Sequence, residues 1–223
     1  MKRTFTLLAM IFIALTSIDL LSAAGKQKEI KNPQFAEFLE GFKVMDLPYE
    51  IKDIDDLFRF WGAEEPISAE LTSSPDTELI PDSMIVKFID PEHKVEEQKC
   101  VLDDAHFYGM KYFCEDFIGV IYTIFSEGAS LTATSQIVLI TYNYDGSVIS
   151  ELGIAGMYFG ATPLGINPVG SWSYTLFSVW PDSIKQKHYS YEYRYGPEET
   201  EVTKADSSYS RIMINKGKVD FTD

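Results

Sequence analysis

The sequence predicts a mainly β protein, with α+β character confined to its N-terminal part, and three observations support this. Runs of β-branched and aromatic residues fill most of the chain after residue 83, turn residues separate them, and no helical pattern lies between them. Short strands joined by tight turns pair antiparallel. We expect about eight strands in a meander, a sandwich or a half-open barrel, preceded by one or two short helices.

Two segments near the N-terminus carry the apolar spacing of helices. In Pro33–Phe42 the apolar residues recur at i, i+3, i+4 and i+7, and Asn32 is placed to cap the first turn. The same spacing runs over Asp53–Trp61, so the helical segment covers about residues 33–62. Between the two, Leu47-Pro48-Tyr49 predicts extended backbone, because the residue before a proline avoids the helical region.

Strand-forming runs occupy most of the remaining chain. Asp145-Gly146 lies between two of them and is a dipeptide that type I′ hairpin turns prefer. Pro181-Asp182 and Lys216-Gly217 separate later strands in the same way. Strands are expected over Met84–Ile89, Ala105–Phe113, Phe117–Phe125, Gln136–Tyr144, Val148–Ile154, Trp172–Trp180, His188–Tyr195, Ser210–Asn215 and Val219–Phe221.

Residues 1–24 have the three parts of a secretory signal peptide. Two cations precede an almost wholly apolar run from Phe5 to Ile18, and Ser22-Ala23-Ala24 supplies the small residues of a cleavage site. A membrane span needs about 20 apolar residues, and Asp19 interrupts this run. We expect cleavage after Ala24, export to the periplasm or the cell exterior, and no stable membrane anchor. Residues 25–223 then form a single soluble, mostly antiparallel β domain.

The chain is strongly acidic. Removal of residues 1–24 takes away two cations and one anion, which leaves 17 Lys and Arg against 33 Asp and Glu. This balance argues against a nucleic-acid partner, because cations that displace counterions supply most of that affinity. Solubility alone explains such acidity, and a cationic partner is the alternative explanation.

The two cysteines of this chain invite a disulfide if the protein is exported. A bridge between Cys100 and Cys114 would close a loop of 15 residues, and a loop of that size stabilises by about 3 kcal/mol when unstrained. Two free buried thiols are the other possibility. The spacing matches no metal-ligand pattern.

The densest candidate site is an aromatic strand near the C-terminus. Alternation places the four tyrosines of His188–Tyr195 on one face, and Trp172 and Tyr174 share a face of the preceding strand. Such rings could stack against a sugar or a peptide. They could equally form an aromatic core layer, since cross-strand aromatic pairs stabilise sheets. The candidate binding residues are Trp172, Tyr174, Tyr191 and Tyr193.

A hydrolase acting on an extracellular polymer is the alternative function. Carboxylates cluster at residues 53–56 and 103–104, where a solvated surface also explains them, and the first cluster lacks the glycine and distal glutamate of a calcium loop. The only histidines are His93, His106 and His188, and they match no metal-ligand or catalytic motif. We assign no catalytic residue, no metal ligand and no cofactor.

Three short motifs also carry a resemblance. Phe35-x-x-Phe38-Leu39-x-x-Phe42, Leu47-Pro48-Tyr49-x-Ile51 and Thr141-Tyr142-x-x-Asp145-Gly146 resemble a group of exported proteins of Gram-negative bacteria that has no assigned activity. Many of its members carry a lipid-attachment cysteine at the cleavage site, which this chain lacks. The leading expectation is a non-enzymatic exported module that binds a protein, peptide or carbohydrate. A structural component of the cell envelope is a third possibility.

Overall fold

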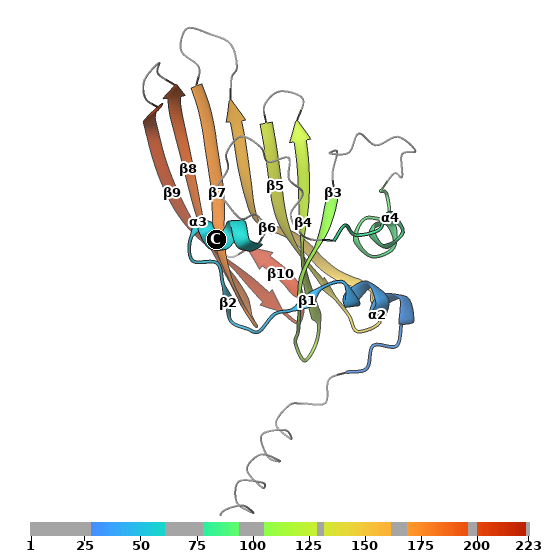
Figure 1. Cartoon of the computed structure of the whole chain (residues 1–223). Helices are drawn as coiled ribbons and strands as arrows, with labels where there is room; N and C mark the ends of the chain where they lie inside the picture. Colours follow the sequence, from blue (N-terminus) through green and yellow to red (C-terminus); the bar gives the residue numbers. More distant parts are fainter. Residues whose placement is uncertain are drawn as a thin grey trace, which may run out of the picture.

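Ten strands form one open, mostly antiparallel sheet, in which β3 to β10 follow one another in space as they do in sequence (Figure 1). This computed structural model describes residues 28–60, 78–93, 105–128, 132–161, 169–195 and 200–221. The mainly β prediction is confirmed, and the arrangement is the meander. The predicted signal peptide, Cys100 and the carboxylates at 103–104 lie outside the described residues.

The strands β3 to β10 correspond to the eight strands predicted after residue 104. Seven of them extend past a predicted bound at one end, because the polar residues at strand ends pair as readily as the apolar ones. Their bounds are β3 Ala105–Phe113, β4 Ile118–Gly128, β5 Thr132–Tyr142, β6 Val148–Ala161, β7 Val169–Trp180, β8 Ser183–Tyr195, β9 Thr200–Asn215 and β10 Lys218–Phe221.

Two short strands from the N-terminal segment join the sheet. β1 (Lys43–Val44) pairs in parallel with β3, and β2 (Tyr49–Glu50) pairs antiparallel with β7. The extended backbone predicted around Pro48 thus becomes β2. Between them these strands carry the chain across one face of the sheet, where α3 (Ile54–Phe60) follows.

Helix α2 (Pro33–Glu40) covers the other face, which we call the α2 face. Asn32 caps it as predicted, because its side-chain oxygen accepts hydrogen bonds from the backbone N–H groups of Gln34 and Phe35 at 3.1 and 3.2 Å. The apolar stripe packs on β4 and β5. The buried residues of this contact are Phe35, Phe38, Leu39, Phe42, Ile118, Val120, Tyr122, Val138, Ile140 and Tyr142.

The segment Met84–Ile89, predicted as a strand, is helical. α4 (Asp82–Met84) continues directly into the π-helix η1 (Ile85–Ile89). Ile85, Phe88 and Ile89 stand at i, i+3 and i+4 and are buried in the α2-face core. In so short a β-branched run the two periodicities cannot be told apart, and packing beside α2 selects the helix.

A second core fills the opposite side, the α3 face. Leu57 and Phe58 of α3 pack there on residues of β4 to β9 such as Ile121, Leu139 and Ile212. The C-terminal hairpin folds back onto the β5–β6 end of the sheet, where the Thr141 hydroxyl donates a hydrogen bond to the carbonyl of Gly217. The lower half of the α3 face is therefore covered, and the ends of β7 to β9 extend beyond α3 (Figure 1).

The two predicted glycine turns both exist, and they differ in type. Gly146 has φ +91°, but Asp145 does not have a positive φ, and Gly146 N–H donates to the Asn143 carbonyl at 3.0 Å. This is a three-residue hairpin with a type I turn, instead of the predicted type I′ turn. Lys216 and Gly217 both have positive φ, at 49° and 85°, and form the type I′ turn between β9 and β10.

No helix in the described ranges is both long enough and apolar enough to cross a membrane.

Candidate functional site

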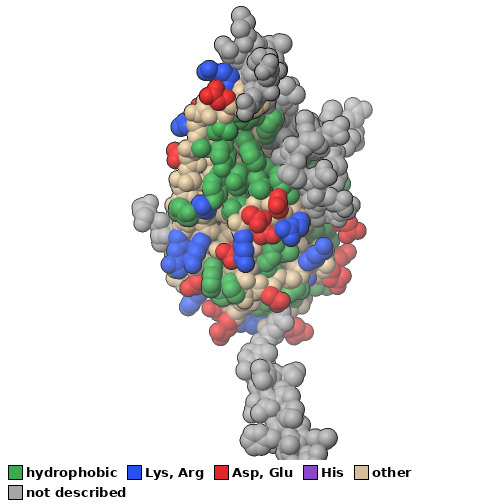
Figure 2. Space-filling view, turned by 60° about the vertical axis from the view of Figure 1, so that its left-hand side comes forward, with side chains coloured by type: hydrophobic (Ala, Val, Ile, Leu, Met, Phe, Trp, Pro, Cys, Tyr) green, Lys and Arg blue, Asp and Glu red, His purple; other side chains and the backbone are tan. Residues whose placement is uncertain are grey.

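Six aromatic rings gather on the α3 face where β6, β7 and β8 extend past α3. Trp172 pairs with Phe159 on β6 and with Tyr191 on β8, and Tyr174 pairs with Tyr189. All six residues are half-buried. Figure 2 shows hydrophobic side chains gathered over the upper half of one face, above a band of charged ones. We call Phe159, Trp172, Tyr174, Tyr189, Tyr191 and Tyr193 the aromatic cluster.

The central rings of the cluster stack on one another. The centroids of Tyr174 and Tyr189 lie 4.9 Å apart at an interplanar angle of 21°, and those of Trp172 and Tyr174 lie 5.2 Å apart at 39°. Rings this close overlap with an offset, so one ring covers part of the face of the next. The ring faces at the centre of the cluster are therefore partly covered by neighbouring rings.

Tyr193 lies differently, at the outer end of the cluster. A Cβ placed on Gly170 would stand 2.5 Å from the Tyr193 ring, so the ring rests directly on the backbone of β7. It thereby reaches across β7 to Phe159, with centroids 6.4 Å apart and an angle of 28°. Because Gly170 takes up one side of the Tyr193 ring, the other side is turned away from the sheet.

Two polar groups of the cluster are desolvated, the Tyr174 phenol and the Trp172 indole N–H. Burial, followed by a hydrogen bond to Tyr191, raises the pKa of the Tyr174 phenol above its ordinary value. The Lys187 ammonium lies 4.5 Å from the Tyr189 ring centroid, and hydrogen bonds to Tyr189 and Tyr209 raise the pKa of Lys187. Trp172 Nε1 is buried and has no acceptor among the described residues. A buried donor left without an acceptor costs about 1–3 kcal/mol.

The predicted facing of Tyr189, Tyr191 and Tyr193 is confirmed, whereas the side chain of Tyr195 lies outside the described residues. His188, Glu192 and Arg194 are exposed on the opposite side of β8. Trp180 lies apart from the cluster at the end of β7, where its ring is 4.7 Å from the Lys185 ammonium. Phe159 is a member that sequence reasoning missed, because the predicted strand ended at Ile154 and β6 continues to Ala161.

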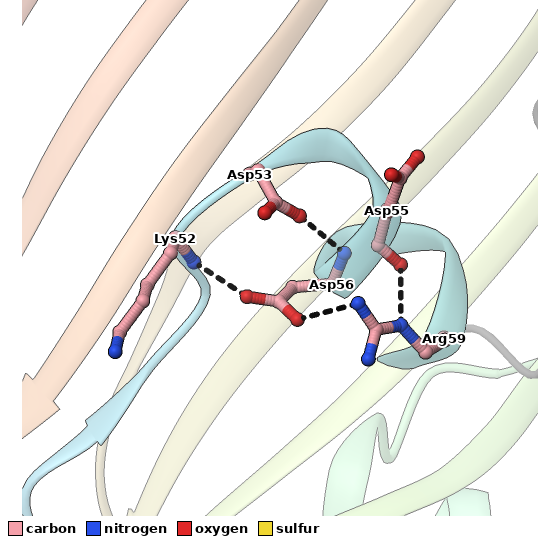
Figure 3. Close-up of polar contacts among 5 residues, drawn as sticks. All are labelled: Lys52, Asp53, Asp55, Asp56 and Arg59. Carbon is pink, nitrogen blue, oxygen red and sulfur yellow. Dashed lines mark hydrogen bonds and ion pairs between the residues drawn. The ribbon is translucent and has the colours of Figure 1, made fainter.

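The carboxylates of residues 53–56 hold the start of α3 (Figure 3). Asp53 accepts from the backbone N–H of Asp56 at 2.8 Å, and Asp56 accepts from the backbone N–H of Lys52 at 3.1 Å, as in a capping box. Asp56 also pairs with the Arg59 guanidinium at 3.0 Å. Two of these carboxylates are thus structural, which accounts for the cluster without catalysis.

The three histidines do not meet in one site. His106 is buried on β3, where its ring lies 5.7 Å from that of His93 and 5.9 Å from that of Tyr122. His93 Nε2 is 3.5 Å from a carboxylate oxygen of Asp82. His188 lies on β8, with four strands between it and β3, and its Nδ1 is 3.0 Å from the Thr175 hydroxyl. Among the described residues no group of His, Cys, Asp and Glu side chains is placed to hold a metal ion.

A cleft of about 630 Å³ lies beside α3, between the β1–β2 segment and a bulge in β3. One residue is inserted in β3 between Phe107 and Met110, which shifts the register against β4 and carries Tyr108 and Gly109 toward the cleft. No local sequence pattern predicts this cleft, because its walls come from three separate segments.

The predicted Cys100–Cys114 disulfide is not formed in this structure, where Cys114 is a free thiol at the end of β3. Cys100 lies outside the described residues. Burial raises the pKa of Cys114 to about 11. The thiol therefore stays protonated at neutral pH, and oxidation to a disulfide requires the thiolate.

The arrangement as a whole is an open antiparallel sheet with a helix-covered half and an aromatic, partly exposed half. No family model, curated protein or solved structure matches this chain.

Proposed function

We propose that this chain is an exported, non-enzymatic binding module that holds a neutral saccharide chain against its aromatic cluster. The observation that carries the proposal is the geometry of Tyr193 and Phe159, whose rings lie side by side across Gly170. A ring that rests on backbone offers its outer side to the C–H face of a sugar. The signal-peptide pattern of residues 1–24 supports export.

The rest of the cluster supports the same ligand class. The tyrosine hydroxyls of the cluster are hydrogen-bond donors and acceptors for sugar hydroxyl groups. Tyrosine and tryptophan supply large contact areas at a small cost in side-chain entropy, so half-exposed rings suit binding. An acidic chain favours a neutral ligand over an anionic one.

The hydrolase alternative gains no support from the described residues. Asp53 and Asp56 are engaged in capping α3, and His106 is separated from His188 by four strands. A peptide ligand remains compatible with the cluster, and the experiment below distinguishes it.

The test is calorimetric titration of the purified protein with neutral glucose hexasaccharides and, separately, with an uncharged peptide that contains aromatic residues. We expect saccharide binding that Tyr193→Ala weakens roughly five- to tenfold, the size of one lost aromatic contact. Tyr158→Ala is the matched control, because Tyr158 is 40 % exposed on β6 and points to the opposite face of the sheet from its neighbour Phe159. Binding of the peptide alone would overturn the saccharide class. Equal binding by both variants, or none of either ligand, would overturn the role of the cluster.

A further inference from the structure

The cleft beside α3 is separate from the aromatic cluster and has aromatic walls of its own. Tyr49 of β2 and Phe60 of α3 form one wall, with ring centroids 6.4 Å apart at 53°. Tyr108 lines the cleft from the β3 bulge and is fixed edge-on to Phe42 at 4.9 Å. All three rings are half-buried. A volume of about 630 Å³ falls in the range of small-molecule sites, roughly 300–1,000 Å³.

The charges around the cleft favour a cation. Glu50, Asp56 and Glu78 line it together with Lys43 and Arg59. Arg59 is already committed, because its guanidinium pairs with Asp56 at 3.0 Å and its Nε donates to the Asp55 carbonyl at 3.3 Å (Figure 3). With Asp56 and Arg59 paired, the remaining charged groups of the cleft are the carboxylates of Glu50 and Glu78 and the ammonium group of Lys43.

The Tyr49 and Tyr108 phenols, on opposite sides of the cleft, are both affected by nearby carboxylates. Burial and then the nearby Asp56 raise the pKa of Tyr49, while burial and then Glu78 and Glu37 raise the pKa of Tyr108. Carboxylates on both sides of the cleft therefore act on groups inside it. A negative potential over aromatic faces is the combination that attracts organic cations.

We propose that this cleft binds a small organic cation, an ammonium group on an apolar skeleton, between Tyr49, Phe60 and Tyr108. The ammonium group interacts with the ring faces and with Glu50 and Glu78, and the skeleton contacts Ile51 and Met110 at the cleft wall. A carboxylate-bearing ligand would face the same two glutamates and be repelled. In this proposal, part of the acidity of the chain serves to bind a cationic ligand and not only to keep the protein soluble.

The test uses three compounds with one skeleton and different charge: choline, the neutral 3,3-dimethylbutan-1-ol and the anionic 3,3-dimethylbutanoate. In calorimetric titrations of the purified protein we expect choline to bind at millimolar concentration and the neutral compound to bind about tenfold more weakly. Equal affinity of the two, tighter binding of the anion, or no binding of choline would overturn the proposal.

Variants that remove a negative or a positive charge from the cleft should change choline affinity in opposite directions. A general loss of folding would weaken binding in all of them. Glu50→Gln and Glu78→Gln are expected to weaken choline binding, whereas Lys43→Gln is expected to strengthen it, because it removes a like charge from the cleft. Glu201→Gln, which makes the same charge change in the exposed N-terminal part of β9, is expected to leave the affinity unchanged. If Glu201→Gln lowered choline affinity as much as Glu50→Gln, the effect would come from the net charge of the protein, and the proposed site would be wrong.

Discussion

The ring of Tyr193 rests on the backbone of Gly170, the residue directly opposite it on β7. A methyl group at position 170 would stand 2.5 Å from the ring, so Gly170→Ala must displace Tyr193 and separate it from Phe159. We expect a small loss of stability, about 1 kcal/mol, and a loss of saccharide affinity similar to that of Tyr193→Ala. Urea unfolding and calorimetric titration measure the two effects.

Gly153→Ala is the control for that substitution. Gly153 lies on β6, and a Cβ there meets no atom within 4 Å. We expect unchanged ligand affinity and a stability equal to or slightly above that of the parent, since alanine reduces the entropy of the unfolded chain. If both alanine variants lose affinity alike, the contact between Tyr193 and Gly170 does not matter for binding.

Tyr142 ties helix η1 to the sheet through its hydroxyl, which donates to the Phe88 carbonyl at 2.7 Å in the α2-face core. Tyr142→Phe keeps the ring and leaves a buried carbonyl without its donor. We expect the free energy of unfolding to fall by about 1–3 kcal/mol, measured by urea unfolding. Tyr209→Phe, on an exposed residue, is expected to change it by less than about 0.5 kcal/mol. Equal effects would show that the Tyr142 hydroxyl contributes nothing to docking η1.

Much of this fold follows from local patterns, and its exceptions have tertiary causes. The strands β3 to β10 alternate and end at turn residues, so their positions could be predicted from the sequence. Met84–Ile89 could not, because an apolar run of six residues fits a strand or a helix equally well. The strands β1 and β2 have two residues each and exist only because β3 and β7 offer free pairing edges.

The candidate sites likewise combine features that local sequence determines with features that depend on tertiary contacts. Tyr189, Tyr191 and Tyr193 share a face because strands alternate, which the sequence determines. How each ring is oriented depends on the residue opposite it on the neighbouring strand, as Gly170 on β7 does for Tyr193. The cleft beside α3 depends on the bulge in β3 and on three segments meeting, and no single stretch of sequence encodes that.

The Cys114 thiol should react slowly in the folded protein. With a pKa of about 11, only about one thiol in a thousand is ionised at pH 8, and the thiolate is the reacting form. We expect labelling by a thiol-specific disulfide reagent to be much slower for the folded protein than in denaturant. A folded protein that labels as fast as the denatured one, or mass analysis that finds a Cys100–Cys114 bridge, would contradict a free, half-buried Cys114 thiol.

The capping contacts of Figure 3 predict unequal roles for neighbouring carboxylates. Asp53→Ala removes the acceptor for the Asp56 N–H and is expected to cost about 0.5–2 kcal/mol. Asp55 contributes only its backbone carbonyl to this network, so Asp55→Ala is expected to cost less, roughly 0.3–1 kcal/mol from the helix dipole. Thermal unfolding of the two variants under identical conditions measures the difference, and a larger cost for Asp55→Ala would contradict the capping assignment.

Alkaline pH should unfold this protein through its buried phenols. Burial raises the pKa of Tyr112, Tyr122 and Tyr142 above the ordinary value near 10, with Glu151 adding to the effect on the last two. In the unfolded chain these phenols lose their protons near pH 10, while the folded chain retains them. The stability they contribute is therefore fully present below about pH 10 and is lost as the pH rises above it.

Tyr142→Phe provides the decisive comparison for this pH dependence. It removes one retained proton, so the decline of unfolding free energy above pH 10 should become shallower by up to about 1.4 kcal/mol per pH unit. Urea unfolding at stepped pH gives the slope, and phenolate absorbance should rise together with unfolding rather than before it. An identical slope in the Tyr142→Phe variant would mean that the Tyr142 phenol already ionises in the folded state, and that its hydrogen bond to Phe88 does not hold the proton.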